Sequence, residues 1–191
     1  MRIRAPGPEP NRWHSRQTPA KLRPGELIRG GEVSPAEVET VAREALELAN
    51  SELNALTMPL FEPALEHDGD GPLAGVPFLI KDSGPFARGV RFTLGSRSVQ
   101  GALALVDHDL MTRFRTAGLV ALGQTTAPEL GLNFSTEPVA YGPTRNPWAL
   151  DRGVGGSSSG AAALAHLGSR ALVPELIEVV RVTAPDAYNT E

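Results

Sequence analysis

This sequence is organised around Gly153-Val154-Gly155-Gly156-Ser157-Ser158-Ser159-Gly160, which runs directly into Ala161-Ala162-Ala163-Leu164. Three consecutive serines lie between glycines, and glycine accepts backbone conformations that other residues disfavour. An alanine-rich helix start follows, and the N–H groups at a helix N-terminus attract anions. The stretch therefore suits a turn that presents hydroxyl and amide groups, while its composition alone would equally suit a flexible Gly/Ser linker.

The composition is that of an ordinary globular protein and excludes several functions. The chain has 191 residues, 41% of them hydrophobic, and a net charge of -4, so no basic field favours nucleic acid. No apolar run approaches the ~18 residues of a membrane span, and a cytoplasmic protein is expected. Cysteine is absent, and the histidines lack the spacing of a zinc site, so no metal is expected; they are His14, His67, His108 and His166.

Helices and strands alternate along the chain. Ser34-Pro35-Ala36-Glu37 is a capping box that starts a helix, and Asn50 is expected to end it. Its apolar stripe is expected to comprise Val38, Val41, Ala42, Ala45, Leu48 and Ala49. A short helical turn is expected over 60–66. A further helix, capped by Asp107 or Asp109, is expected to run through Ala117 with Leu110 and Phe114 on one face, and a last one over 160–167.

Two continuously apolar runs, 73–80 and 119–123, are expected to be strands buried on both faces. Residues 82–101 and 124–153 are expected to be loops. Helix-then-strand order predicts an α/β protein whose mixed, partly parallel sheet is flanked by helices. Residues 1–24, rich in proline and arginine, are expected to form a disordered basic arm.

Lys81 is the second feature of the sequence that suggests a function, because this charged residue comes directly after the apolar run 73–80. Burial would lower the pKa of its amine, and a neutral lysine can act as a general base towards a serine. The alternative is that Lys81 extends to solvent beside Asp82.

The serine stretch also satisfies G-x-S-x-G, the nucleophile elbow of α/β-hydrolases. That motif needs a strand before it, and residues 148–153 do not read as one; the only histidine that follows, His166, lies inside the next helix. The patterns of a Walker phosphate loop and of a dinucleotide-binding turn are not met either.

Two segments resemble the amidase signature family. The run from Gly71 to Asp82 is similar to that family's lysine segment, and 142–148 together with Gly155–Gly160 are similar to its serine loop. The stretches 107–118, 125–129 and 135–138 are most similar to the branch that includes 6-aminohexanoate cyclic dimer hydrolase. The resemblance covers about residues 25 to 167.

The resemblance implies a Ser–Ser–Lys mechanism on a small-molecule amide, without a cofactor. Neutral Lys81 would accept a proton from Ser157, which the family holds behind a cis peptide bond, and Ser157 would deprotonate a second, nucleophilic serine. The surrounding turn would supply contacts to the substrate or its oxyanion. These turn residues are Gly155, Gly156, Ser158, Ser159 and Gly160.

The nucleophile implied by the resemblance has no counterpart in this sequence. It belongs in an Asp-x-Gly-Gly-Ser-x-Arg turn about two dozen residues after Ser157, whereas no glycine follows Gly168 and no serine follows Ser169. Residues 25–168 are therefore expected to be the N-terminal part of a truncated amidase domain, with 169–191 an atypical tail. Such a chain is expected to be inactive alone and to self-associate through exposed edges. The alternative is a non-catalytic remnant or a binding module that uses the serine turn as an anion site.

Overall fold

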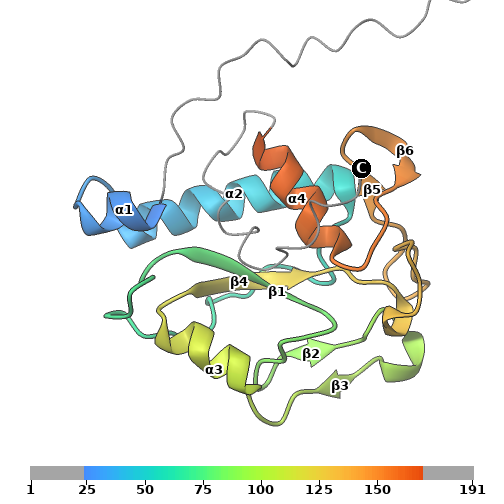
Figure 1. Cartoon of the computed structure of the whole chain (residues 1–191), viewed down its shortest axis with the longest axis horizontal. Helices are drawn as coiled ribbons and strands as arrows, with labels where there is room; N and C mark the ends of the chain where they lie inside the picture. Colours follow the sequence, from blue (N-terminus) through green and yellow to red (C-terminus); the bar gives the residue numbers. More distant parts are fainter. Residues whose placement is uncertain (1–23, 170–191) are drawn as a thin grey trace, which may run out of the picture.

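A computed structural model describes residues 24–169 of the chain, as an α/β arrangement of helices around a central strand pair (Figure 1). The expectations for the two chain ends lie outside these residues, apart from Pro24 and Ser169. The helices are α1 (Pro24–Arg29), α2 (Pro35–Leu53), α3 (Asp109–Thr116) and α4 (Ser159–Ser169), with single 3-10 turns η1 (Arg97–Val99) and η2 (Glu129–Gly131). The strands are β1 (Pro77–Lys81), β2 (Arg91–Phe92), β3 (Ala102–Leu103), β4 (Val120–Thr125), β5 (Arg145–Asn146) and β6 (Ala149–Gly153).

The predicted parallel pairing is confirmed. β1 lies parallel to β4 with Lys81 opposite Thr125, and both strands are buried except at Lys81. β1 begins four residues later than its apolar run, because Leu73 and Val76 close a turn through a 3.1 Å backbone hydrogen bond. Pro77 therefore occupies the first strand position, where a missing N–H is tolerated.

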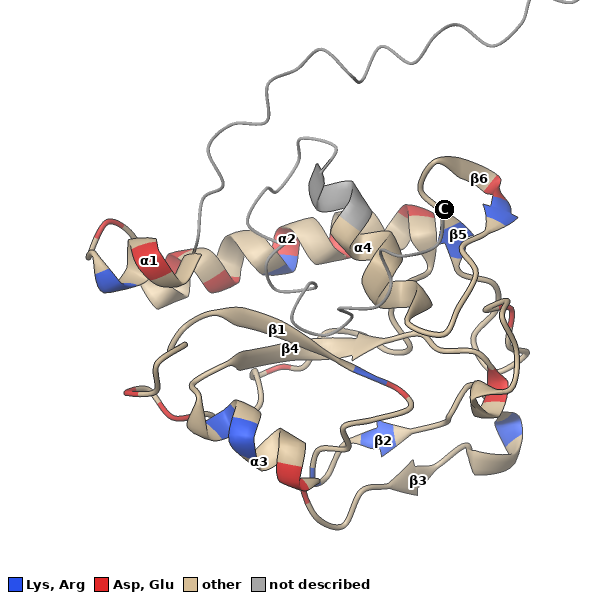
Figure 2. Ribbon diagram, viewed as in Figure 1, with Lys and Arg blue, Asp and Glu red and all other residues tan. Residues whose placement is uncertain are grey.

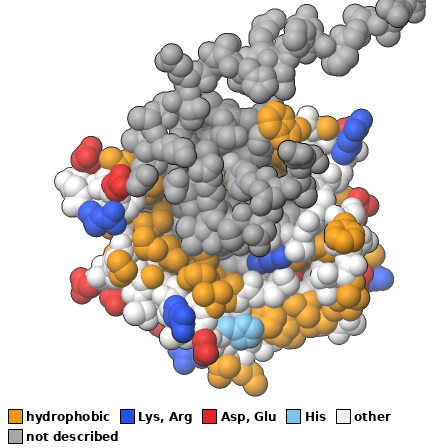
Figure 3. All heavy atoms as spheres, viewed as in Figure 1, with side chains coloured by type: hydrophobic (Ala, Val, Ile, Leu, Met, Phe, Trp, Pro, Cys, Tyr) orange, Lys and Arg blue, Asp and Glu red, His pale blue; other side chains and the backbone are white. Residues whose placement is uncertain are grey.

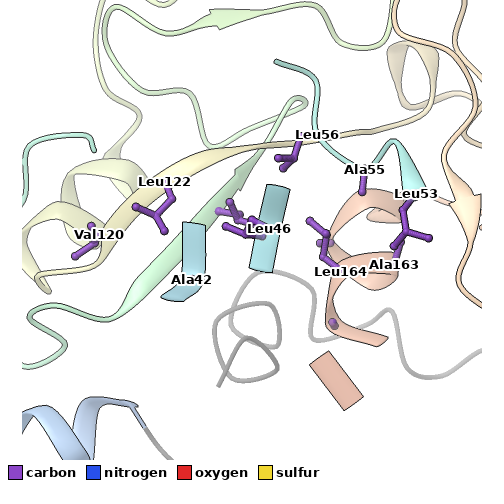
Figure 4. Close-up of a cluster of buried hydrophobic side chains, with 12 residues drawn as sticks. Ala42, Leu46, Leu53, Ala55, Leu56, Val120, Leu122, Ala163 and Leu164 are labelled. Carbon is purple, nitrogen blue, oxygen red and sulfur yellow. The ribbon is translucent and has the colours of Figure 1, made fainter. Parts of the chain in front are cut away.

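Alternation along these two strands divides the core into two clusters. Leu79, Val120 and Leu122 point to one face and pack with α2 and α4, as Figure 4 shows for the β4 residues. Phe78 and Ile80 point to the other face, towards Met111 of α3. Helices therefore cover both faces of the strand pair (Figure 1).

α2 confirms the predicted capping box but corrects the predicted end and the predicted face. The helix continues to Leu53, because the Asn50 side chain accepts hydrogen bonds from the backbone N–H groups of Ala55 and Leu56 instead of ending the helix itself. Leu46 is 1% exposed, whereas Leu48, predicted to face the core, is 55% exposed. Val41 is likewise exposed.

The short helical turn predicted over 60–66 is wrong. This segment runs along the edge of β4 that faces away from β1, where the N–H groups of Phe61 and Leu65 donate to the carbonyls of Leu122 and Ala121. These N–H groups bond to backbone carbonyls of β4, so they are not available for the hydrogen bonds of a helix.

α3 forms where it was predicted, but neither aspartate caps it. His108 occupies the N-cap position without a side-chain hydrogen bond, and the carboxylate of Asp107 instead binds the backbone of Arg88 and the guanidinium of Arg115. The helix buries Met111 rather than Leu110, which is 49% exposed. Gly118, with φ +87, follows the C-cap residue Ala117, where the helix ends.

β6 corrects the expectation that residues 148–153 are not a strand. β6 pairs antiparallel with β5 in a mostly exposed hairpin, so it carries no buried apolar pattern that a sequence could reveal. The nucleophile-elbow alternative is now disfavoured for a different reason, because such an elbow follows a strand of the central parallel sheet. None of the helices in the described part of the chain combines the length and apolar character of a membrane span.

Because α2 buries Leu46 and exposes Leu48, replacing each leucine by alanine is expected to change the free energy of unfolding by different amounts. Leu46→Ala is expected to lower the free energy of unfolding by about 2–5 kcal/mol, because it empties a buried position. Leu48→Ala should change that free energy by no more than about 0.5 kcal/mol. Urea denaturation followed by circular dichroism measures both, and equal losses would contradict this packing.

Candidate active site

The structure brings Lys81 and the serine turn together. The Lys81 Nζ lies 3.1 Å from the Ser157 Oγ and 3.2 Å from the Ser158 Oγ, across 76 residues of sequence in the first case. In Figure 2 the ribbon of β1 turns from tan to blue and then to red at its C-terminal end, where Lys81 is followed by Asp82. The carboxyl end of β1 thus delivers the amine to the turn that precedes α4.

Lys81 does not pair with its acidic neighbour. Its side chain is half-buried and hydrogen-bonds the two serines, while Asp82 is fully buried and accepts hydrogen bonds from Thr93 and Gly95. Burial lowers the pKa of the Lys81 amine from its ordinary value. This geometry favours the interpretation that the Lys81 amine acts on the serines, over the alternative that Lys81 extends to solvent beside Asp82.

The serine turn has the cis peptide bond that the resemblance implies. Gly155 has φ +83, which glycine adopts readily, and the peptide bond between Gly156 and Ser157 is cis. Ser157 is exposed and Ser158 is half-buried, so both hydroxyls lie on the accessible side of the turn. Because Ser157 hydrogen-bonds Lys81 and Ser159 hydrogen-bonds the Gly155 carbonyl, the stretch is a defined turn rather than a flexible linker.

Ser159 and Gly160 differ from the other predicted site residues because they are buried. The Ser159 hydroxyl donates to the Gly155 carbonyl at 2.9 Å and shares a hydrogen bond with Thr136. A Cβ at Gly160 would lie 2.2 Å from the Ala55 carbonyl oxygen, so only glycine allows α4 to begin this close to the chain beyond α2. These two residues hold the turn in place, whereas Ser157 and Ser158 face the amine.

Sequence reasoning missed several polar residues that support the turn. Thr126 and Thr144 are fully buried and share a hydrogen bond of 2.7 Å between their hydroxyls, and Thr144 also donates to the Asn54 carbonyl. The Tyr141 hydroxyl accepts from the Ala127 N–H and donates to the Ala127 carbonyl, and burial raises the pKa of that hydroxyl. Thr144 lies within the recognised serine-loop motif and Thr126 within the similar stretch 125–129, so a signal for both existed, although residue type alone does not reveal their supporting role.

The chemistry that this arrangement allows is proton transfer between an amine and a hydroxyl. A lysine whose neutral form is favoured by burial can accept a proton from a serine at this distance. Among residues 24–169, no group of three or more acidic or histidine side chains could hold a metal ion.

Comparisons with known proteins agree on one family. The family described as Amidase matches residues 38–170. The 6-aminohexanoate-cyclic-dimer hydrolase of Paenarthrobacter ureafaciens is 42% identical over 142 residues, which cover 72% of this chain and 29% of that protein. A glutamyl-tRNA(Gln) amidotransferase subunit from Cutibacterium acnes is 35% identical over 150 residues, 73% of this chain and 30% of that protein.

The fold of the chain also matches solved structures. A solved structure of 6-aminohexanoate cyclic dimer hydrolase complexed with substrate superposes with a TM-score of 0.65 and 39% identity, covering 80% of this chain and 31% of that one. The chain thus spans less than a third of the length of these relatives.

The lowered pKa predicts that Lys81 becomes reactive at a lower pH than an ordinary lysine. Lys21 and Lys81 are the lysines of the sequence, so trace acetylation followed by peptide mass spectrometry resolves each amine. The pH midpoint of Lys81 acetylation should be lower in the folded chain than in the same chain unfolded in urea, because burial disfavours the ammonium form. Equal midpoints in the two states would contradict the environment described for Lys81.

Proposed function

This chain belongs to the amidase family, and from that premise we propose that Lys81 and Ser157 form the proton-transfer part of a site that hydrolyses amide bonds. The observation that carries the proposal is the 3.1 Å approach of Lys81 Nζ to Ser157 Oγ. Both residues stand where the recognised motifs of the family require a lysine and a bridging serine.

In the proposed reaction, Lys81 acts as the base. Burial lowers the pKa of its amine and so makes the neutral form more accessible, and in that form the amine accepts the proton of the Ser157 hydroxyl. Ser157 in turn removes the proton of a nucleophilic serine as that serine attacks the amide carbonyl carbon. When the C–N bond breaks, the same relay returns the proton to the leaving amine. Water then hydrolyses the acyl-serine ester by the same proton path.

The nucleophilic serine is the part of this relay that the sequence lacks. No serine follows Ser169, and Ser157 and Ser158 both lie within hydrogen-bond distance of Lys81, where a bridging residue belongs. We therefore propose that the chain by itself binds and positions but does not cleave an amide. A binding module for a small anion at the Ser157 turn is the second candidate, favoured by the exposed Ser157 hydroxyl beside the Lys81 amine.

The proposed substrates are linear or cyclic amides of small molecules. This choice rests on the relative that shares 42% identity over 142 residues, whose name describes hydrolysis of the 6-aminohexanoate cyclic dimer.

A full-length chimera tests the relay. Residues 1–168 of this chain would replace the region that they match in the Paenarthrobacter enzyme, so that the remainder of that enzyme supplies the nucleophile. The chimera should hydrolyse the cyclic dimer, and Lys81→Met should lower kcat/KM about 10²–10⁴-fold, the usual contribution of a general base. Ser157→Ala should cause a comparable loss, and Ser158→Ala a smaller one.

Matched controls separate this relay from a general loss of function. Lys21→Met removes the other lysine and should leave kcat/KM of the chimera unchanged. The chain alone should neither hydrolyse the dimer nor react with a fluorophosphonate probe. A folded chimera whose activity survives Lys81→Met would refute the proposed base, and saturable phosphate binding by an unreactive chain would favour the anion-binding alternative.

We also propose that the chain self-associates. Among the described residues β1 pairs with β4 alone, so its other edge has no strand partner there. Figure 3 shows apolar side chains gathered on the surface, and the corner between β3 and α3 is notably apolar. Its exposed residues are Leu103, Leu105, Val106 and Leu110.

Light scattering measures this association directly. Because open strand edges and apolar surface promote pairing between chains, the apparent mass should rise with protein concentration. Leu105→Glu, at a position 85% exposed, should reduce that rise without lowering the melting temperature. A monodisperse monomer at all concentrations would contradict the proposal.

A further inference from the structure

Asp82 is a buried carboxylate that the proposed relay does not use. It follows Lys81 directly, is 0% exposed, and its backbone N–H donates to the Thr125 carbonyl at 3.0 Å, which extends the pairing of β1 and β4 by one residue. A carboxylate in the interior requires hydrogen-bond donors that replace water.

The donors of Asp82 all come from one turn. Oδ1 accepts from the Thr93 N–H at 2.7 Å, and Oδ2 accepts from the Thr93 hydroxyl at 2.7 Å and from the Gly95 N–H at 2.8 Å. Leu94 and Gly95 both have positive φ, at 50 and 69. Charge-assisted hydrogen bonds of this length are among the stronger ones in proteins, so Asp82 holds this turn in its unusual backbone conformation.

The turn held by Asp82 packs directly on the segment that follows β4. The Leu94 carbonyl accepts the Leu130 N–H at 2.6 Å. A Cβ at Gly95 would lie 2.9 Å from the Ala127 carbonyl oxygen and 3.0 Å from the Glu129 nitrogen, so the two backbones are in close contact.

That segment in turn supports the serine turn. A Cβ at Gly156 would lie 2.8 Å from the Pro128 Cγ and 3.3 Å from the carbonyl oxygens of Asn133 and Phe134. A continuous line of contacts therefore runs from Asp82 through residues 93–95 and 127–134 to the peptide bond that precedes Ser157. This path is separate from the direct hydrogen bond between Lys81 and Ser157.

We propose that Asp82 is a positioning residue for the Lys81–Ser157 pair: its carboxylate fixes the 93–95 turn, and that turn sets the place of the segment against which Gly156 and Ser157 lie. The proposal rests on the proposed function and deepens it. One residue at the end of β1 thus places both partners, because Lys81 is its direct neighbour and Ser157 is reached through the packed turns.

The test measures the acetylation midpoint of Lys81 in the intact chain. Asp82→Asn keeps the shape of the side chain but places an amide where Oδ2 accepts two donors. The midpoint should rise by about 0.5 pH unit or more, because a displaced Lys81 becomes more solvated. Loss of the Asp82 negative charge alone would move the midpoint the other way, so the direction separates positioning from electrostatics.

Three further variants complete the test. Thr93→Val removes one of the donors without a change of charge and should raise the midpoint by a smaller amount; Thr93→Ser keeps the hydroxyl and should leave it unchanged. Leu46→Ala should lower the melting temperature without moving the midpoint, which shows that the midpoint does not simply follow stability. If Asp82→Asn does not fold, Thr93→Val against Thr93→Ser carries the test.

The outcomes are distinct for the two proposals. A wild-type midpoint equal to that of the unfolded chain would count against the environment on which the proposed base depends. A lowered wild-type midpoint that stays the same or falls in folded Asp82→Asn and Thr93→Val would overturn the role of Asp82 alone.

Discussion

The structure depends on the parallel pairing of β1 and β4. Because the two strands run in the same direction and finish opposite each other at Lys81 and Thr125, the chain leaves both at the same edge of the sheet. The residues that follow the two strands, Asp82 after β1 and Thr126 after β4, therefore lie at the same end of the strand pair. Burial of both strands between α2 and α4 on one face and α3 on the other holds that edge in place.

At this end of the sheet the site is held together by buried polar contacts rather than by the two serines that face the amine. Thr126 binds Thr144 by a side-chain hydrogen bond, and Ser159 donates to the Gly155 carbonyl while it shares a hydrogen bond with Thr136. Each of these four residues is at most 2% exposed, so they leave the surface of the turn to Ser157 and Ser158. The consecutive serines thus divide into two that face the amine and one that supports the turn.

The sequence predicted what depends on local patterns and motifs. The capping box at Ser34, the two buried strands and the association of Lys81 with the serine turn follow from residue types at short range or from a family motif. The buried face of α2 did not, because Leu46 and Leu48 are equally apolar and only the position of β4 and α4 decides which is covered. β6 escaped prediction because an exposed hairpin has no apolar alternation. The role of Asp82 depends on a turn eleven residues away, which no spacing rule connects to it.

The contacts that hold the serine turn have a consequence for the order of folding. Asn54 at the end of α2 donates to the Tyr141 and Pro143 carbonyls, 87 and 89 residues further on, and Lys81 meets Ser157 across 76 residues. Contacts between distant residues close large loops, and the entropy of loop closure makes them slow to form. The helix α2 and its capping box, by contrast, are stabilised by contacts a few residues apart. We therefore expect α2 to form early in refolding. The hydrogen bond between the Lys81 amine and the Ser157 hydroxyl should be among the last contacts to form.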